Sequence, residues 1–164
     1  MHLKDIMTRG VECILSDASI REAAEKMRTL NVGTLPVMDR DRLVGMITDR
    51  DITVRATALG WRPDCTPVRD AMTAEVVFCF ENQDVGEAAR LMKENKVRRL
   101  VVLDTAHRLV GIVSLGDLAV LTRDDRLAGN TLEGVSEPVR PRGKGNGNGK
   151  ASKPQCAATN APVI

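Results

Sequence analysis

The apolar positions of the first third of the chain follow two periods, and each period predicts a type of element. Between residues 20 and 30 they recur every three or four positions, which is the spacing of one face of an α-helix. Ser19 precedes Glu22 by three positions, the capping-box spacing that begins a helix, and Asn31-Val32-Gly33 ends it. Short apolar runs predict three strands, of which the last two form a hairpin: residues 11–15, 34–38 and 43–48.

The rest of the first half contains a proline in a strand and a second helix, and the second half repeats the order of elements. Pro36 lies within the second strand of the first half and predicts an edge strand or a strand end, because proline has no N–H to donate to a neighbouring strand. A helix over residues 51–59 follows the first hairpin and ends at Gly60. In the second half, the pattern predicts a strand, a helix that repeats the capping logic with Asp84 and Glu87, a hairpin, and a last helix ending near Thr122; the strands span residues 76–80, 99–103 and 109–114.

Six matched blocks in the same order indicate an internal duplication. The opening Asp5-Ile6-Met7-Thr8 recurs as Asp70-Ala71-Met72-Thr73, 65 positions later, and the offset becomes 66 after the turn around His107. Each repeat reads β-α-β-β-α in about 50 residues, which is too short to bury its own apolar faces. We therefore predict an α/β (α+β) fold in which two repeats pack sheet face to sheet face as a pseudo-two-fold pair, share a core and form two equivalent clefts at the strand ends.

Composition and charge divide the chain into three parts. We place the first repeat and its linker at residues 1–66, the second repeat at 67–125, and a flexible, disordered basic tail at 126–164. Residues from 135 onward carry five basic side chains and one acidic side chain, a charge of +4, so that the rest of the chain carries −2 of the net +2.

Several function classes are disfavoured by composition. Aromatic residues make up 2% of the chain, with no tyrosine, and the body is near neutral, which argues against a nucleic-acid surface. The four cysteines and two histidines lack metal-ligand spacing, and no nucleophile–base pattern or phosphate-binding loop stands out. We expect no metal, no catalysis and no required cofactor. The absence of a signal-peptide pattern and of a long apolar run predicts a cytoplasmic protein without a membrane span.

A polar turn ends the second hairpin strand of both repeats. It reads Gly45-Met46-Ile47-Thr48-Asp49-Arg50-Asp51 in the first and Gly111-Ile112-Val113-Ser114-Leu115-Gly116-Asp117 in the second. A hydroxyl and a carboxylate at the rim of a sheet are suited to a small ligand. Helix N-capping explains the same residues without a ligand. The duplication favours binding, and both interpretations remain open.

These motifs resemble those of a tandem pair of cystathionine-β-synthase (CBS) domains, also called a Bateman module. The resemblance rests on the Asp-x-Met-Thr openings, the Leu-Pro-Val-Met-Asp strand at 35–39 and the two turns, and it covers about residues 3–122. Within the family, the sequence is similar to the small stand-alone bacterial members. The resemblance implies a non-catalytic regulatory module, commonly dimeric, that senses an adenosine-containing ligand such as AMP, ADP, ATP, S-adenosylmethionine or NAD.

The resemblance also implies a role for each site residue. Asp51 and Asp117 would accept the ribose hydroxyls, and Thr48 and Ser114 would contact ribose or phosphate. The other residues would meet the adenine with backbone groups, pack on the base, or offset phosphate charge, and they are Val32, Gly33, Thr34, Met46, Arg50, Val97, Arg98, Arg99 and Ile112.

Three functional hypotheses follow. The first is a sensor of an adenosyl ligand, which acts as a homodimer on an unknown regulated protein. The alternative is a ligand-free dimeric interaction scaffold or a stress- or dormancy-related protein. The weakest is nucleic-acid binding through the basic tail.

Overall fold

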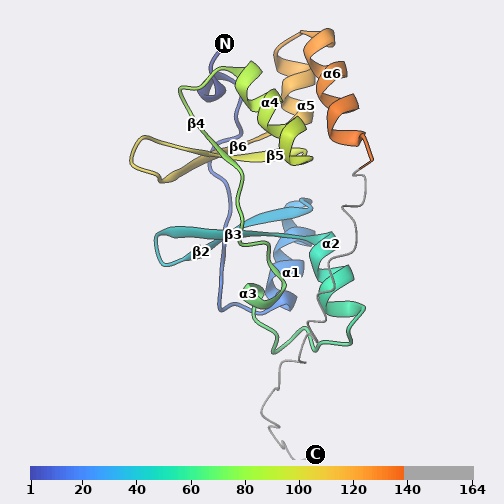
Figure 1. Ribbon diagram of the computed structural model, residues 1–164. Helices are drawn as coiled ribbons and strands as arrows, with labels where there is room; N and C mark the ends of the chain where they lie inside the picture. Colours follow the sequence, from blue (N-terminus) through green and yellow to red (C-terminus); the bar gives the residue numbers. More distant parts are fainter. Residues whose placement is uncertain (139–164) are drawn as a thin grey trace, which may run out of the picture.

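A computed structural model describes residues 1–138 as two three-stranded sheets with their helices, stacked one above the other (Figure 1). The first half contains η1 (Leu3–Asp5), β1 (Ile14–Leu15), α1 (Ile20–Leu30), β2 (Thr34–Asp39), β3 (Arg42–Thr48), α2 (Asp49–Asp51), the π-helix η2 (Ile52–Thr57) and α3 (Val68–Ala71). The second half contains β4 (Phe78–Phe80), α4 (Val85–Asn95), β5 (Arg99–Leu103), β6 (Leu109–Ser114), α5 (Leu115–Leu121) and α6 (Asp125–Ser136). The predicted β-α-β-β-α order is confirmed in both repeats.

Both sheets have the same topology. The middle strand pairs in parallel with the first strand and antiparallel with the third, so that each predicted hairpin is present. Thr34 faces Thr48 in the first sheet, and Arg99 faces Ser114 in the second. Each polar turn therefore begins beside the first residue of its middle strand.

The placement of Pro36 corrects one expectation. Proline lies inside β2, which is the middle strand of its sheet and not an edge. Its partner across the hairpin is Met46, whose backbone N–H and C=O both bond to Thr73, so the missing N–H of Pro36 removes no bond to β3. Since β1 pairs only with Val37 and Met38, a middle strand tolerates proline at this position.

The first helix of each repeat begins at its predicted cap. Ser19 Oγ accepts from the N–H of Glu22 at 3.2 Å, and Glu22 Oε2 accepts from the N–H of Ser19 at 2.7 Å. Asp84 caps α4 differently, because its Oδ1 accepts from the N–H of Gly86 at 2.8 Å, while Glu87 pairs with an arginine of its own helix. The buried faces of α1 and α4 contain Ile20, Ala23, Met27, Val85, Ala88, Ala89 and Met92.

The two repeats exchange their opening segments. Leu3, Ile6 and Met7 belong by sequence to the first repeat but pack in the core of the second, with residues of β4–β6 and α4. Val68 and Ala71 open the second repeat but pack in the core of the first. The predicted division between residues 66 and 67 follows the duplication in the sequence, whereas the packing links each repeat to the other.

Two glycines of the polar turns make this exchange possible. A Cβ on Gly111 would lie 2.7 Å from Met7 Sδ and 2.9 Å from the carbonyl oxygen of Thr8. A Cβ on Gly45 would lie 2.6 Å from Met72 Sδ and 2.9 Å from the carbonyl oxygen of Thr73. The Asp-x-Met-Thr opening of one repeat thus lies directly against the glycine of the other repeat's turn.

Two further expectations are wrong. The buried apolar residues form two clusters, one for each sheet with its helices, instead of the single shared core that we predicted. The tail predicted from residue 126 begins with a helix, α6, which packs on α4 and α5 (Figure 1). Asp124 caps α6, and Thr131 and Val135 are buried on it. The remainder of the predicted tail, residues 139–164, lies outside the described residues. Through residue 138, no helix has the length and apolar character needed to cross a membrane.

Candidate functional site

A cavity of about 430 Å³ is lined by both repeats. The second repeat contributes the end of β6 and its polar turn, with Arg99 beside them. The first repeat contributes the segment after η1 and the junction between α1 and β2. The lining residues are Thr8, Gly10, Val11, Glu12, Leu30, Asn31, Val32, Gly33, Thr34, Leu35, Arg99, Ile112, Ser114 and Asp117. The volume lies within the range of small-molecule sites.

Asp117 caps α5 with one carboxylate oxygen and leaves the other available. Its Oδ2 accepts from the backbone N–H and the Oγ of Ser114, both at 2.7 Å. Ser114 Oγ in turn accepts from the N–H of Asp117 at 3.1 Å. The capping interpretation is therefore confirmed, and it does not exclude a ligand, because Asp117 Oδ1 has no hydrogen-bond partner within residues 1–138.

The turn of the first repeat has the same cap but a different environment. Asp51 Oδ2 accepts from the N–H of Thr48 at 3.0 Å and from its Oγ1 at 2.7 Å. The other oxygen, Oδ1, lies 3.4 Å from Nη2 of Arg55. Arg55 escaped the sequence prediction, although the duplication contained a signal, since the equivalent residue of the second repeat is Leu121.

The cavity brings together seven of the thirteen predicted site residues: Val32, Gly33, Thr34, Arg99, Ile112, Ser114 and Asp117. The prediction omitted Thr8, which ends the repeated Asp-x-Met-Thr opening and could have been found from that motif. It also omitted the segment from Gly10 to Glu12, for which no motif gave a signal.

The other six predicted residues lie elsewhere. Val97 packs against the core of the second repeat, and Met46 exchanges backbone hydrogen bonds with Thr73. Arg50 is exposed at the turn, next to the capping pair Thr48 and Asp51. Arg98 lines a neighbouring hollow of about 570 Å³ between the α5 turn and α6, which shares Arg99 and Ser114 with the cavity.

Some of the charged side chains on the cavity wall are already paired, and others are available to a ligand. Glu12 pairs with Lys26 at 2.7 Å, and this hydrogen bond and ion pair lower the pKa of the Glu12 carboxyl. Lys26 also donates to the carbonyl oxygen of Cys13 at 2.7 Å. Arg99 and Asp117 Oδ1 form no ion pair within the described part of the chain. One cation and one carboxylate oxygen therefore remain for a ligand.

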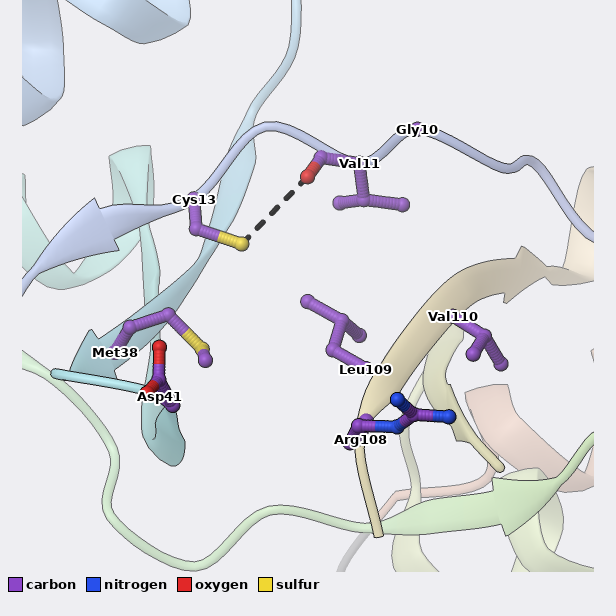
Figure 2. A pocket seen from close by; sticks show the side chains of 8 residues that line it. All are labelled: Gly10, Val11, Cys13, Met38, Asp41, Arg108, Leu109 and Val110. Atoms are coloured by element: carbon purple, nitrogen blue, oxygen red, sulfur yellow. Dashed lines mark hydrogen bonds between the residues drawn. The ribbon is translucent and has the colours of Figure 1, made fainter. Parts of the chain in front are cut away.

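A third hollow, of about 520 Å³, lies between the two hairpins and shares Gly10 and Val11 with the cavity (Figure 2). Cys13, Met38 and Leu109 point into it. Burial raises the pKa of the Cys13 thiol, which donates to the carbonyl oxygen of Val11 at 3.6 Å. Arg108 at its rim is already bonded to Asp104 at 2.7 Å. Of the polar groups that line this hollow, the Cys13 thiol and Arg108 already have hydrogen-bond partners, which leaves Asp41 as the one lining charge without an ion pair in residues 1–138.

The comparisons with known proteins agree with this architecture. The CBS domain family matches residues 3–56 and 68–125, and this chain belongs to it. The CBS domain-containing protein YhcV of Bacillus subtilis is 42% identical over 134 residues, which cover 82% of this chain and 94% of that protein.

Two solved structures show what related proteins hold. The CBS domain pair of protein MJ0100, in complex with 5′-methylthioadenosine and S-adenosyl-L-methionine, is 31% identical, with a TM-score of 0.67, over 74% of this chain and 99% of that chain. Hypoxic Response Protein I, with two coordinated zinc ions, is 37% identical, with a TM-score of 0.66, over 73% and 97%. In the present chain, residues 1–138 contain no group of three or more His, Cys, Asp or Glu side chains that could hold a metal ion.

Proposed function

We propose that this chain is a non-catalytic regulatory module that binds an adenosine-containing ligand in the cavity between its two repeats. The observation that carries the proposal is the free carboxylate oxygen of Asp117, which lies in a cavity of suitable volume lined by both repeats. The related pair that holds 5′-methylthioadenosine and S-adenosyl-L-methionine supports the ligand class.

The cavity offers a separate group to each part of such a ligand. Asp117 accepts ribose hydroxyls, since an ionised carboxylate is a strong acceptor of two donors. Ile112 and Val32 supply apolar contact for the base, and the backbone at Gly33 and Thr34 supplies its polar partners. Arg99, which forms no ion pair within residues 1–138, faces the negatively charged end of a phosphorylated ligand.

A ligand in this position connects the two repeats, and this suggests how binding becomes a signal. It contacts the α1–β2 junction of the first repeat and the β6 turn of the second, so its affinity depends on how the two are arranged. A ligand that prefers one arrangement shifts the population toward it, and a partner protein then recognises that arrangement.

The proposal includes a homodimer. Val54 and Val120, at equivalent positions of the two repeats, are 48% and 72% exposed. Apolar side chains repeated about the pseudo-two-fold axis suit an interface with a second copy. Light scattering tests this part, with a mass of two chains expected and a mass of one chain contradicting it.

Calorimetry with AMP, ATP, S-adenosylmethionine and NAD tests the ligand. At least one of the four is expected to bind the wild-type protein, and Asp117→Asn is expected to weaken that binding. Absence of binding by all four up to millimolar concentration would refute the sensing function. In that case, a stable dimer would favour the ligand-free scaffold.

A further inference from the structure

Arg55 links two residues whose equivalents line the cavity. By the offsets of the duplication, Asp117 and Thr8 correspond to Asp51 and Thr73. Asp117 and Thr8 both line the inter-repeat cavity. Asp51 and Thr73 are instead joined by one guanidinium, because Arg55 Nη2 lies 3.4 Å from Asp51 Oδ1 and 3.1 Å from Thr73 Oγ1.

The guanidinium is held by further acceptors. Arg55 Nη1 donates to the carbonyl oxygens of Ala71 at 2.8 Å and Met72 at 2.7 Å. Both carbonyls belong to the exchanged opening segment that packs on the first repeat. The four oxygens around Arg55 match the several donors of a guanidinium, and the Asp51 side chain is only 14% exposed.

The second repeat lacks a cationic side chain at the position equivalent to Arg55. Leu121 occupies the position equivalent to Arg55, and its side chain is 47% exposed. Leucine has no donor for Asp117, whose Oδ1 therefore stays available, as described above. Arg55 also lies on the π-helix η2, whereas Leu121 ends the α-helix α5, so the element after the turn differs between the repeats.

We propose that Arg55 occupies, in the first repeat, the position that the sugar of an adenosyl ligand takes beside Asp117 in the second, and that it limits the chain to one ligand. This proposal rests on the proposed function for its ligand class. A guanidinium donates to the Asp51 carboxylate as ribose hydroxyls would donate to Asp117, so the site at Asp51 is satisfied from within the chain. The residue thus determines the stoichiometry, without itself contacting the bound ligand.

Reciprocal exchange of the two equivalent side chains tests the proposal. AMP and S-adenosylmethionine serve as separate probes, and calorimetry measures the number of sites per chain. We expect one site in the wild type, two in Arg55→Leu and none in Leu121→Arg, in which the new guanidinium reaches Asp117. Arg90→Leu is the matched control, because Arg90 is an exposed arginine of α4 that pairs only with Glu87 and Glu94 in the described structure, and it should keep one site.

The outcomes separate this proposal from the proposed function. One site in both the wild type and a folded Arg55→Leu protein would overturn the role of Arg55 and leave the sensing function intact. Two sites in the wild type would do the same. Binding by neither protein would overturn both. If Arg55→Leu does not fold, Leu121→Arg decides alone: loss of the site supports the proposal, and unchanged affinity refutes it.

Discussion

The turns at Thr48–Asp51 and Ser114–Asp117 are nearly identical in local structure and differ in what surrounds them. In both turns, the hydroxyl residue donates a hydrogen bond to the carboxylate of the aspartate three positions later, with an O···O distance of 2.7 Å. They differ in the far carboxylate oxygen, which meets Arg55 in one repeat and no group of residues 1–138 in the other. Both repeats therefore keep the helix cap, but a binding site also needs an acceptor without a partner in the protein. The residue four positions after the aspartate, Arg55 or Leu121, determines whether that acceptor is available.

The largest effect is expected where the repeats are alike. Gly45→Ala and Gly111→Ala each place a Cβ within 3.0 Å of a methionine sulfur and a carbonyl oxygen of the exchanged opening segment. The carbonyl belongs to backbone and cannot move away easily, so each variant should lose about 1–3 kcal/mol of unfolding free energy. Urea denaturation measures both.

Similar losses in the two glycine variants would confirm that the exchange is symmetric. Gly129→Ala is the matched control, since a Cβ there meets nothing within 4 Å. It should be neutral or slightly stabilising because the residue is in α6. Stability unchanged in Gly45→Ala or Gly111→Ala would contradict the packing of the openings against the turns.

The next largest effect concerns ligand affinity, which should depend on the Ser114–Asp117 turn. Asp117→Asn keeps an oxygen for the cap but replaces the free charged acceptor with a neutral amide. Hydrogen bonds to a charged group contribute about 1.5–3 kcal/mol, so affinity for the bound nucleotide should fall about 10- to 100-fold. Fluorescence or calorimetric titration measures the change, and wild-type affinity in this variant would show that the ligand is not held at Asp117.

The equivalent change in the first repeat should act on stability. Asp51→Asn removes the anionic partner of Arg55, which is itself 42% exposed and thus partly screened by water. We expect a loss of about 1 kcal/mol in unfolding free energy, larger than that of Asp117→Asn. Thermal unfolding without ligand compares the two, and a greater loss in Asp117→Asn would reverse our assignment of the paired and free carboxylates.

The smallest effect concerns pH and the hairpin turns. Asp104 accepts from the backbone N–H of Arg108 at 2.9 Å, from the Arg108 side chain at 2.8 Å and from the backbone N–H of Ala106 at 2.9 Å, and these bonds lower the pKa of its carboxyl. The equivalent Asp39 is exposed. Because the folded pKa of Asp104 lies below its unfolded value, the contribution of Asp104 to stability is complete above the unfolded pKa and is lost as pH falls through the folded pKa.

The wild type should therefore lose more stability than Asp104→Asn between about pH 5 and pH 2, the range over which a carboxyl with a lowered pKa becomes protonated. Unfolding curves at several pH values give the difference in unfolding free energy between the two proteins. The other carboxyl groups titrate in both proteins, so their contributions cancel in this difference. Parallel pH profiles of the two proteins would contradict this assignment.

Repetition in the sequence predicted the elements and both hairpins, but it did not predict which repeat each opening segment packs on. The capping box at Ser19 and the two hairpins follow from local rules, and the resemblance at the turns pointed to Ser114 and Asp117, which the cavity contains. The exchange of Met7 and Met72 could not be read, because an apolar opening segment does not specify which of two similar sheets it covers. The same ambiguity left open which residues of the first repeat line the cavity that contains Asp117.

Departures from the repeat were less visible than the repeat itself. Arg55 was not predicted because it belongs to no matched block of the two repeats, yet its replacement by Leu121 in the second repeat is what makes the two turns differ. Helix α6 was missed because glycine and polar residues interrupt it, although Leu127, Thr131 and Val135 are spaced four apart and Asp124 is a good cap.

A crystal structure of the full chain grown with AMP tests the central claim most directly. The account predicts one nucleotide per chain in the inter-repeat cavity, with its ribose hydroxyls on Asp117 and with Arg55 still bonded to Asp51 and Thr73. A ribose bound to Asp51 with Arg55 displaced, or a nucleotide only in the hollow at Cys13 and Leu109, would contradict it.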